Sequence, residues 1–273
     1  MTKIPNSRRN LDLALERLHG RGREAQQART SMANVIVGQL LPCGVVKGGS
    51  ALKLRYGYAN TRFTTDLDAA RDEDLEIFID ELAASLESGW NGFTGTIAER
   101  EPAHPTGVPE GYVMQPFDIK LAYNGKSWVT VPLEIGHDEI GDTDEPDHSI
   151  SEDMVDLFTQ LGFPAPRPVA IMSLHHQIAQ KLHGLTGENS ARAHDLVDLQ
   201  LIAAHDDIDM PKTKEACVRL FASRRKQVWP PTIVKGRDWD EIYDHAKEDL
   251  PVLPTVDEAI VWGNRLVMTI SEA

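Results

Sequence analysis

The fold is decided by the stretch VVKGGSALKLRYG, Val45 to Gly57, and by the segment RFTTDLDAA, Arg62 to Ala70, that follows it. The first three residues predict a short strand, and the two glycines after them predict a turn. A helix is expected from Ala51 to about Tyr56, with Ser50 able to cap its N-terminus. The alternation from Arg62 to Asp68 predicts a second strand. The chain therefore turns through small residues from a strand into a helix, and a pair of aspartates follows on the next strand.

Further helices and strands are expected on both sides of this stretch. Apolar residues recur at helical spacing from Leu11 to Leu41, and an amphipathic helix is expected from Asp72 to Ser88. Three strands follow, and the last two form a hairpin because Asn124-Gly125 is a favourable two-residue turn. The three strands are expected at Phe93–Glu99, Met114–Tyr123 and Ser127–Ile135. These elements predict a mixed sheet with helices on one side.

The order of elements changes near residue 148. From His137 to His148 the chain is rich in acids and contains Gly141 and Pro146, which is typical of a linker. Only helices are expected after it, near Asp153–Leu161, Met172–Leu185, Ala191–His205, Lys212–Arg225, Trp239–Lys247 and Val256–Ile270. The predicted architecture is an α/β (α+β) domain over residues 1–148, followed by a helical domain over residues 149–273.

The chain of 273 residues is acidic, with 28 Lys and Arg against 42 Asp and Glu and a formal net charge of −14. Such a charge repels polyanions at long range unless the basic residues are clustered. They do cluster in two places, over Met1 to Arg29 and from Arg219 to Lys226. Contact with a nucleic acid would depend on these patches, but for either patch taken alone a solvated charged helix face is the favoured interpretation.

Cysteine use and hydropathy favour a cytoplasmic protein. Cys43 and Cys217 lie far apart without the spacing of a disulfide framework, which fits a reducing compartment. The N-terminus has basic residues but lacks the apolar segment of a signal peptide. The most apolar stretch, Val35 to Val46, is interrupted by Gln39 and Pro42 and is too short to span a bilayer. We expect no membrane association.

The turn through Gly48, Gly49 and Ser50 is a candidate phosphate site. A strand that turns into a helix N-terminus exposes backbone N–H groups at the positive end of the helix dipole, which suits a triphosphate. The turn alone is a weak signal, because small residues also occur at such turns for steric reasons.

Asp66 and Asp68 make the signal specific. Side chains two residues apart on a strand point to the same face, so the two carboxylates are expected to converge while Leu67 points into the core. Paired oxygen ligands select Mg²⁺ or Mn²⁺, and two such ions can hold the attacking and leaving oxygens of a phosphoryl transfer. Glu134 is the best candidate for a third ligand and for a base that accepts the acceptor's proton, with Asp118 as its rival.

A third group of candidates lies in the helical half. Lys181 is at the edge of an apolar helix stripe, and Arg192, Asp195 and Asp198 are spaced three residues apart on the following helix. Such residues could bind the triphosphate and the base or ribose of a nucleotide. The alternative is an ion pair that holds the two helices together.

The sequence resembles the AbiEii/AbiGii toxin family, nucleotidyltransferase-like proteins of bacterial toxin–antitoxin and phage-defence loci. The matching segments are the two quoted at the start, VPLEIG at Val131–Gly136, and QKLHGLTGENSARAHDLVDLQLI at Gln180–Ile202. The lysine helix followed by Asp195 and Asp198 is characteristic of this family. In this chain His194 stands before Asp195, where an arginine or lysine is frequent.

The resemblance implies a fold like that of DNA polymerase β with a helical C-terminal domain. It also implies NTP and Mg²⁺ as ligands, a cognate antitoxin, and an acceptor that in some relatives is the 3′ end of tRNA. It assigns Gly49 and Ser50 to the triphosphate, Asp66 and Asp68 to metal, and Lys181 and Asp195 to a supporting site.

Two other functions stay open. Transfer of a nucleotide to a protein or small molecule, as in AMPylation or drug adenylylation, needs no basic groove and fits the acidic charge. A non-catalytic scaffold that binds nucleotide is the other, and the intact Asp66 and Asp68 argue against it.

Overall fold

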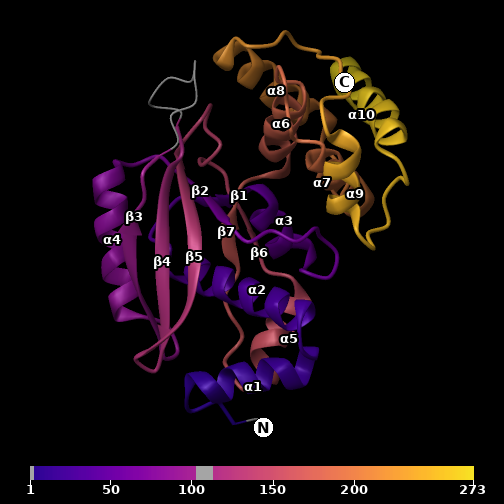
Figure 1. Cartoon of the computed structure of the whole chain (residues 1–273). Helices are drawn as coiled ribbons and strands as arrows, with labels where there is room; N and C mark the ends of the chain where they lie inside the picture. Colours follow the sequence, from indigo (N-terminus) through magenta and orange to yellow (C-terminus); the bar gives the residue numbers. More distant parts are fainter. Residues whose placement is uncertain (1–2, 103–112) are drawn as a thin grey trace. The chain divides into compact units, whose positions relative to one another are not determined.

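The computed structural model describes residues 3–102 and 113–273, which form two compact units, drawn together in Figure 1. The first unit combines the chain up to Ala59 with Phe63–Asp138 and Pro146–Ile171, and the second combines Asn60–Arg62, Glu139–Glu145 and Met172–Ala273. The expected boundary at residue 148 differs from this division. The difference arises because a strand that begins at the end of the supposed linker, the helix after it and one further strand belong to the first unit.

The first unit is built on a seven-stranded sheet in the order β3-β4-β5-β2-β1-β7-β6. The strands are β1 Val45–Lys47, β2 Leu67–Arg71, β3 Phe93–Glu99, β4 Gln115–Tyr123, β5 Lys126–His137, β6 Asp147–Ser149 and β7 Val169–Ile171. Strand β2 is parallel to β5 and β1 is parallel to β7, whereas the other neighbours are antiparallel. The prediction of a mixed sheet is confirmed.

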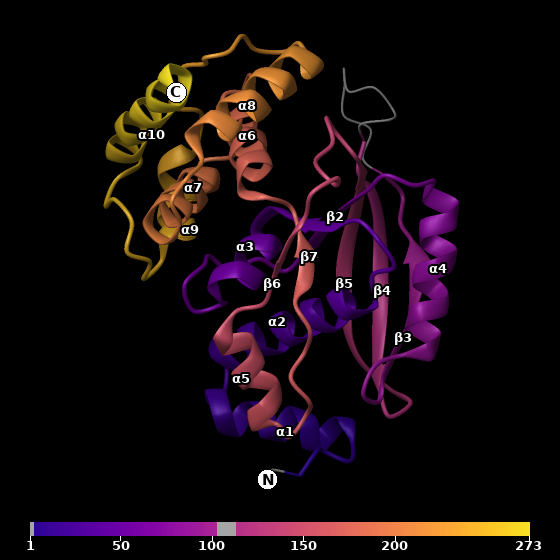
Figure 2. The same ribbon diagram turned by 180° about the vertical axis from the view of Figure 1, so that it is seen from behind.

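The described part of this unit contains five helices: α1 Arg8–His19, α2 Arg23–Leu40, α3 Gly48–Tyr56, α4 Leu75–Ser88 and α5 Glu152–Gln160. Figure 2 shows α4 beside β3. The helices and alternate strand residues such as Ile119 and Leu133 share one hydrophobic core, whereas Lys120 and Thr130 on the other face are exposed. The core therefore lies on one side of the sheet, and polar strand residues occupy the other side.

Local sequence accounts for several element boundaries. Asn124 and Gly125 both have positive φ, 47° and 72°, as the turn of the β4–β5 hairpin requires.

The prediction that only helices follow residue 148 was wrong, because β7 is a strand beside β1. At three residues, β7 is too short to give a periodic signal.

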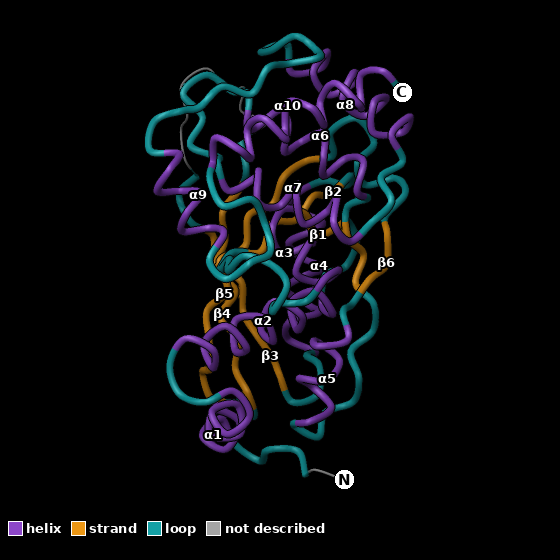
Figure 3. The backbone as a smooth tube through the Cα atoms, turned by 90° about the vertical axis from the view of Figure 1, so that its right-hand side faces the viewer, coloured by secondary structure: helices purple, strands orange, loops and turns teal. Residues whose placement is uncertain are grey.

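The second unit is helical, as the purple coils of Figure 3 show. Its helices are α6 Leu174–Leu185, α7 His194–His205, α8 Met210–Arg224, α9 Trp239–Lys247 and α10 Val256–Glu272. Buried apolar side chains such as Leu182, Leu199 and Phe221 form its interior. Within residues 3–102 and 113–273, no helix combines the length and the apolar character needed to cross a membrane.

Candidate active site

The turn from β1 into α3 is tighter than the sequence suggested. Helix α3 begins at Gly48, with Lys47 at the N-cap position, so the expectation that Ser50 caps this helix was wrong. Gly48 has a φ of 66°, and a Cβ there would collide with the carboxylate of Asp68. A residue with a side chain would therefore be strained at this position, and glycine lets the helix start approach the aspartate.

Asp68 and Glu134 are direct neighbours across the sheet. Asp68 is in register with Glu134 on β5 and with Lys47 on β1, so the three side chains share one face. Asp118 is opposite Pro132 instead, and it forms an ion pair with Arg100 at 3.8 Å. The sheet register therefore places Glu134, and not Asp118, beside Asp68.

Asp66 lies just before β2, so the expectation that both aspartates are strand residues was wrong for Asp66. Its carboxylate accepts hydrogen bonds from the hydroxyls of Thr64, at 3.2 Å, and Thr65, at 3.0 Å. Burial alone would raise the pKa of Asp66, but hydrogen bonds from backbone N–H groups and these hydroxyls lower it below its usual value. Asp66 is therefore ionised at neutral pH and can act as a cation ligand.

Lys53, which was not predicted as a site residue, contacts the same segment. Its side chain is 2% exposed, and its ammonium group donates to the carbonyl of Thr64 at 2.8 Å. A lysine three residues after Ser50, in the part of α3 up to Leu54 where the other residues are small or apolar, was the available signal. Among the described residues, no group of three or more His, Cys, Asp and Glu side chains is gathered as a metal site.

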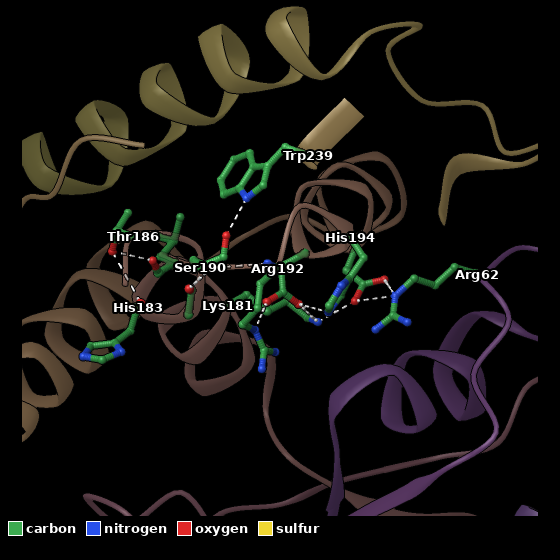
Figure 4. Close-up of polar contacts among 12 residues, drawn as sticks. Arg62, Lys181, His183, Thr186, Ser190, Arg192, His194 and Trp239 are labelled. Carbon is green, nitrogen blue, oxygen red and sulfur yellow. Dashed lines mark hydrogen bonds and ion pairs between the residues drawn. The ribbon is translucent and has the colours of Figure 1, made fainter. Parts of the chain in front are cut away.

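In the second unit Lys181 is at the centre of a buried charge cluster (Figure 4). Its ammonium nitrogen lies 3.0 Å from a carboxylate oxygen of Asp195 and 2.6 Å from one of Asp198. Arg192 contacts Asp195 at 2.6 Å, and Arg62 contacts Asp198 at 3.0 Å. We call these five residues the Lys181 cluster; it joins α6 to α7, as an interhelical ion pair would.

The cations of the cluster keep both aspartates ionised. Burial is the largest single effect and would raise the pKa of Asp195 and Asp198, but the neighbouring cations, Lys181 foremost, together outweigh it, and the pKa of each is below its usual value. Arg192 adds to the effect at Asp195, and Arg62 adds to it at Asp198. Three cations therefore face two carboxylates, which leaves one surplus positive charge.

His194 does not replace the basic residue that is frequent before Asp195 in this family. Its ring nitrogen lies 3.9 Å from the Asp195 carboxylate, and burial lowers its pKa to about 4. The imidazole is therefore neutral at pH 7, and Arg192 is the cation beside Asp195. Arg62, which the sequence analysis did not select, is the corresponding cation beside Asp198.

The basic residues near the end of α8 are partly engaged in ion pairs. The Arg224 guanidinium forms a two-point contact with the carboxylate of Glu139, and it also lies 3.2 Å from the His183 ring. Burial, reinforced by Arg224, lowers the pKa of His183 to about 4. Arg225 and Lys226 are exposed. Arg225 and Lys226 are therefore suited to a solvent-facing role.

A comparison with protein-family models matches residues 33–261 to the nucleotidyl transferase AbiEii toxin family of type IV toxin–antitoxin systems. The chain belongs to this family. The AbiEii match covers β1, α3, β2 and β5 as well as the Lys181 cluster, so it includes the carboxylates and the helical unit as far as residue 261. Membership makes the chain a nucleotidyltransferase toxin by family, as the sequence resemblance indicated.

The AbiEii chain also resembles a solved structure, MenT4, a nucleotidyltransferase toxin from Mycobacterium tuberculosis. The two share 16% sequence identity at a TM-score of 0.55, over 96% of this chain and 98% of the other. At this identity the likeness shows a common fold. No protein with curated information matches the chain in a sequence search.

Proposed function

We propose that this protein transfers a nucleotide from an NTP to the 3′ end of a tRNA, with the help of divalent cations. The observation that carries the proposal is the pairing of Asp68 and Glu134 across β2 and β5, next to the glycine turn that starts α3. The chain that carries this arrangement belongs to a family of nucleotidyltransferase toxins.

The start of α3 is proposed to bind the triphosphate. The first N–H groups of a helix have no partner inside it, and here they belong to Gly48, Gly49 and Ser50. They lie at the positive end of the helix dipole, which attracts phosphate oxygens. Lys47, the N-cap residue, adds a positive charge on the face of the sheet that carries Asp68.

Asp66, Asp68 and Glu134 are proposed to hold Mg²⁺ or Mn²⁺, although among the described residues these three carboxylates are not gathered as a metal site. The fit rests on the donors: all three are carboxylates, Asp66 is ionised, and the missing Cβ of Gly48 leaves room at the Asp68 oxygens. A divalent cation there would offset charge on the reacting phosphate and favour ionisation of the attacking hydroxyl. Glu134 is proposed to accept the proton of that hydroxyl, because it is the carboxylate in register with Asp68.

The Lys181 cluster is proposed to support binding of the nucleotide. Lys181 is 4% exposed and contacts both aspartates, so its main role is to hold α6 against α7. Asp195 and Asp198 then orient Arg192 and Arg62. The surplus positive charge of the cluster resides on these arginines, and the half-exposed Arg192 is the one proposed to meet phosphate oxygens.

The metal and transfer roles are tested by Asp68→Asn and Glu134→Gln. Both variants should fold like the wild type and lose transfer, since each loses a carboxylate charge that a divalent cation requires. Thermal stability without metal should hold or rise in Asp68→Asn, because repulsion from the neighbouring carboxylate is relieved. Full activity of either variant would rule out the role given to that carboxylate.

The acceptor is the part of the proposal that depends on family resemblance. Arg9 and Arg17 on α1 and Arg225 and Lys226 after α8 are exposed and suited to contact RNA phosphates. The logarithm of RNA affinity should then fall with the logarithm of salt concentration, with a slope of about −0.7 to −0.9 per phosphate contact. Reversing Arg225 and Lys226 to Glu should flatten the slope and leave NTP binding unchanged. Salt-independent transfer would instead favour a protein or small-molecule acceptor.

A further inference from the structure

Two side chains of α3 donate hydrogen bonds to the segment that leads to Asp66. The Ser50 hydroxyl donates to the carbonyl of Asp66 at 2.6 Å, and the Lys53 ammonium group donates to the carbonyl of Thr64 at 2.8 Å. Both donors are 2% exposed. Water therefore cannot easily replace either donor, and an unpaired ammonium group at this depth would be costly.

The spacing of these contacts explains why they occur together. Residues three apart on a helix lie on the same side, and carbonyls two residues apart on an extended chain point in the same direction. Ser50 and Lys53 thus match the carbonyls of Asp66 and Thr64 in the way that a neighbouring strand would. This arrangement also explains why the strand predicted from Arg62 begins only at Leu67.

Ser50 is oriented in turn by Asn34 of α2. The Asn34 amide nitrogen lies 3.4 Å from the Ser50 oxygen and donates to it, and Asn34 is 3% exposed. A hydroxyl has one proton, so a Ser50 oxygen that accepts from Asn34 and donates to Asp66 has no proton left for a phosphate. The role expected for Ser50 at the triphosphate is therefore proposed for its backbone N–H and not for its hydroxyl.

We propose that Ser50 and Lys53 are positioning residues that hold the backbone of Thr64–Asp66, and that Asn34 orients the Ser50 hydroxyl. The consequence for catalysis rests on the proposed function, because it concerns the Asp66 carboxylate as a cation ligand. These two hydrogen bonds, which we call the clamp, hold the backbone that carries Asp66 just before β2. Asp68 lies on β2 itself and is held by the pairing of β2 with β1 and β5. The two aspartates are thus held by different means, one by helix side chains and the other by strands.

The direct test measures the carbonyl ¹³C chemical shifts of Thr64 and Asp66 by NMR in the metal-free protein. Lys53→Met should move the Thr64 resonance and leave that of Asp66 nearly unchanged, and Ser50→Ala should do the reverse. Asn34→Leu should move the Asp66 resonance in the same direction as Ser50→Ala. Ser50→Thr, which keeps the hydroxyl, should preserve the wild-type shift. Unchanged carbonyl shifts in Lys53→Met and Ser50→Ala would refute the clamp even if transfer activity is never detected.

Kinetics distinguish positioning from phosphate binding. Loss of one of these hydrogen bonds should lower kcat about two- to tenfold for Ser50→Ala and about tenfold or more for Lys53→Met, with the KM for NTP changed less than about twofold. The double variant Asn34→Leu/Ser50→Ala should be no slower than Ser50→Ala, because Asn34 acts through Ser50. A raised KM with an unchanged kcat would show that these side chains bind the triphosphate instead.

Ser31→Ala is the matched control. Ser31 is on α2, three residues before Asn34, it is 1% exposed, and its hydroxyl oxygen has no hydrogen-bond partner among the described residues. Its removal should leave kcat and both carbonyl shifts at wild-type values. A loss as large as that of Asn34→Leu would mean that general packing of α2, and not the Asn34 contact, controls the segment.

Discussion

Replacing Asp198 with Asn should destabilise the second unit strongly. Asp198 is 1% exposed and contacts both Lys181, at 2.6 Å, and Arg62, at 3.0 Å. The amide keeps the shape of the side chain but removes its charge. Lys181, Arg62 and Arg192 would then face Asp195 alone, so the surplus positive charge of the cluster would rise from one to two.

The expected magnitude follows from the burial of the partners. Removing one member of a buried ion pair typically costs about 3–5 kcal/mol, because its partner stays buried without compensation. Lys181 is 4% exposed and cannot reach water, whereas the Arg62 side chain is 18% exposed and can turn toward solvent. We therefore expect a loss near the lower end of that range. Lys181→Met should cost less, since each aspartate keeps one arginine.

Urea unfolding followed by tryptophan fluorescence measures both effects, because Trp239 is buried in the second unit. The free energy of unfolding should fall by about 3 kcal/mol in Asp198→Asn and by a smaller amount in Lys181→Met. Thr186→Val, at the end of α6 and outside the cluster, is a control for local packing. A change below about 1 kcal/mol in Asp198→Asn would refute the view that the Lys181 cluster holds α6 to α7.

Three further outcomes follow from individual contacts. The pKa of His194 is lowered to about 4, so the unfolded state binds more protons than the folded state between about pH 6.5 and pH 4. The stability of the protein should therefore fall as the pH is lowered through this window, and His194→Gln should make this fall smaller in thermal melts. An unchanged pH profile would contradict the lowered pKa. Gly48→Ala should reduce transfer more than tenfold and lower the melting temperature, because the new methyl group meets the Asp68 carboxylate at a positive φ; wild-type kcat would argue against this close approach. In urea unfolding, Arg224→Met should lower the free energy of unfolding more than the double variant Arg224→Met/Glu139→Gln does. The single change leaves the Glu139 carboxylate, which is 12% exposed, without its cation. Equal losses of unfolding free energy in the two variants would mean that the ion pair contributes nothing.

The sequence predicted most of the fold because long amphipathic elements carry a strong periodic signal. Helix α9 and strand β3 have the predicted bounds, Trp239–Lys247 and Phe93–Glu99. Short elements whose partners are distant in sequence were missed. Strand β7, three residues long, lies in the sheet because β1 pairs with it, and three residues cannot show a period.

The candidate site was predicted in part, and its geometry explains the errors. Glu134 was selected from a strand expected to neighbour that of Asp68, and β5 places it in register with Asp68, whereas its role as ligand and base stays a prediction. Asp66 was predicted to lie on a strand because its segment has the sequence pattern of an extended chain. That pattern does not show whether the carbonyls of the segment accept hydrogen bonds from a neighbouring strand or, as here, from the side chains of a helix. Arg62 and Lys53 were not selected, since their partners are distant in sequence or belong to the backbone.

The most direct test of the proposed function is incubation of the purified protein with each α-labelled NTP, Mg²⁺ and total tRNA. Wild-type protein should label the 3′ end of tRNA with one or more of the four nucleotides, and Asp68→Asn, folded by circular dichroism, should label nothing. Label on a protein or small molecule would keep nucleotidyl transfer and reject tRNA as the acceptor. Absence of label with every NTP, or undiminished labelling by Asp68→Asn, would contradict catalysis at the Asp68–Glu134 pair.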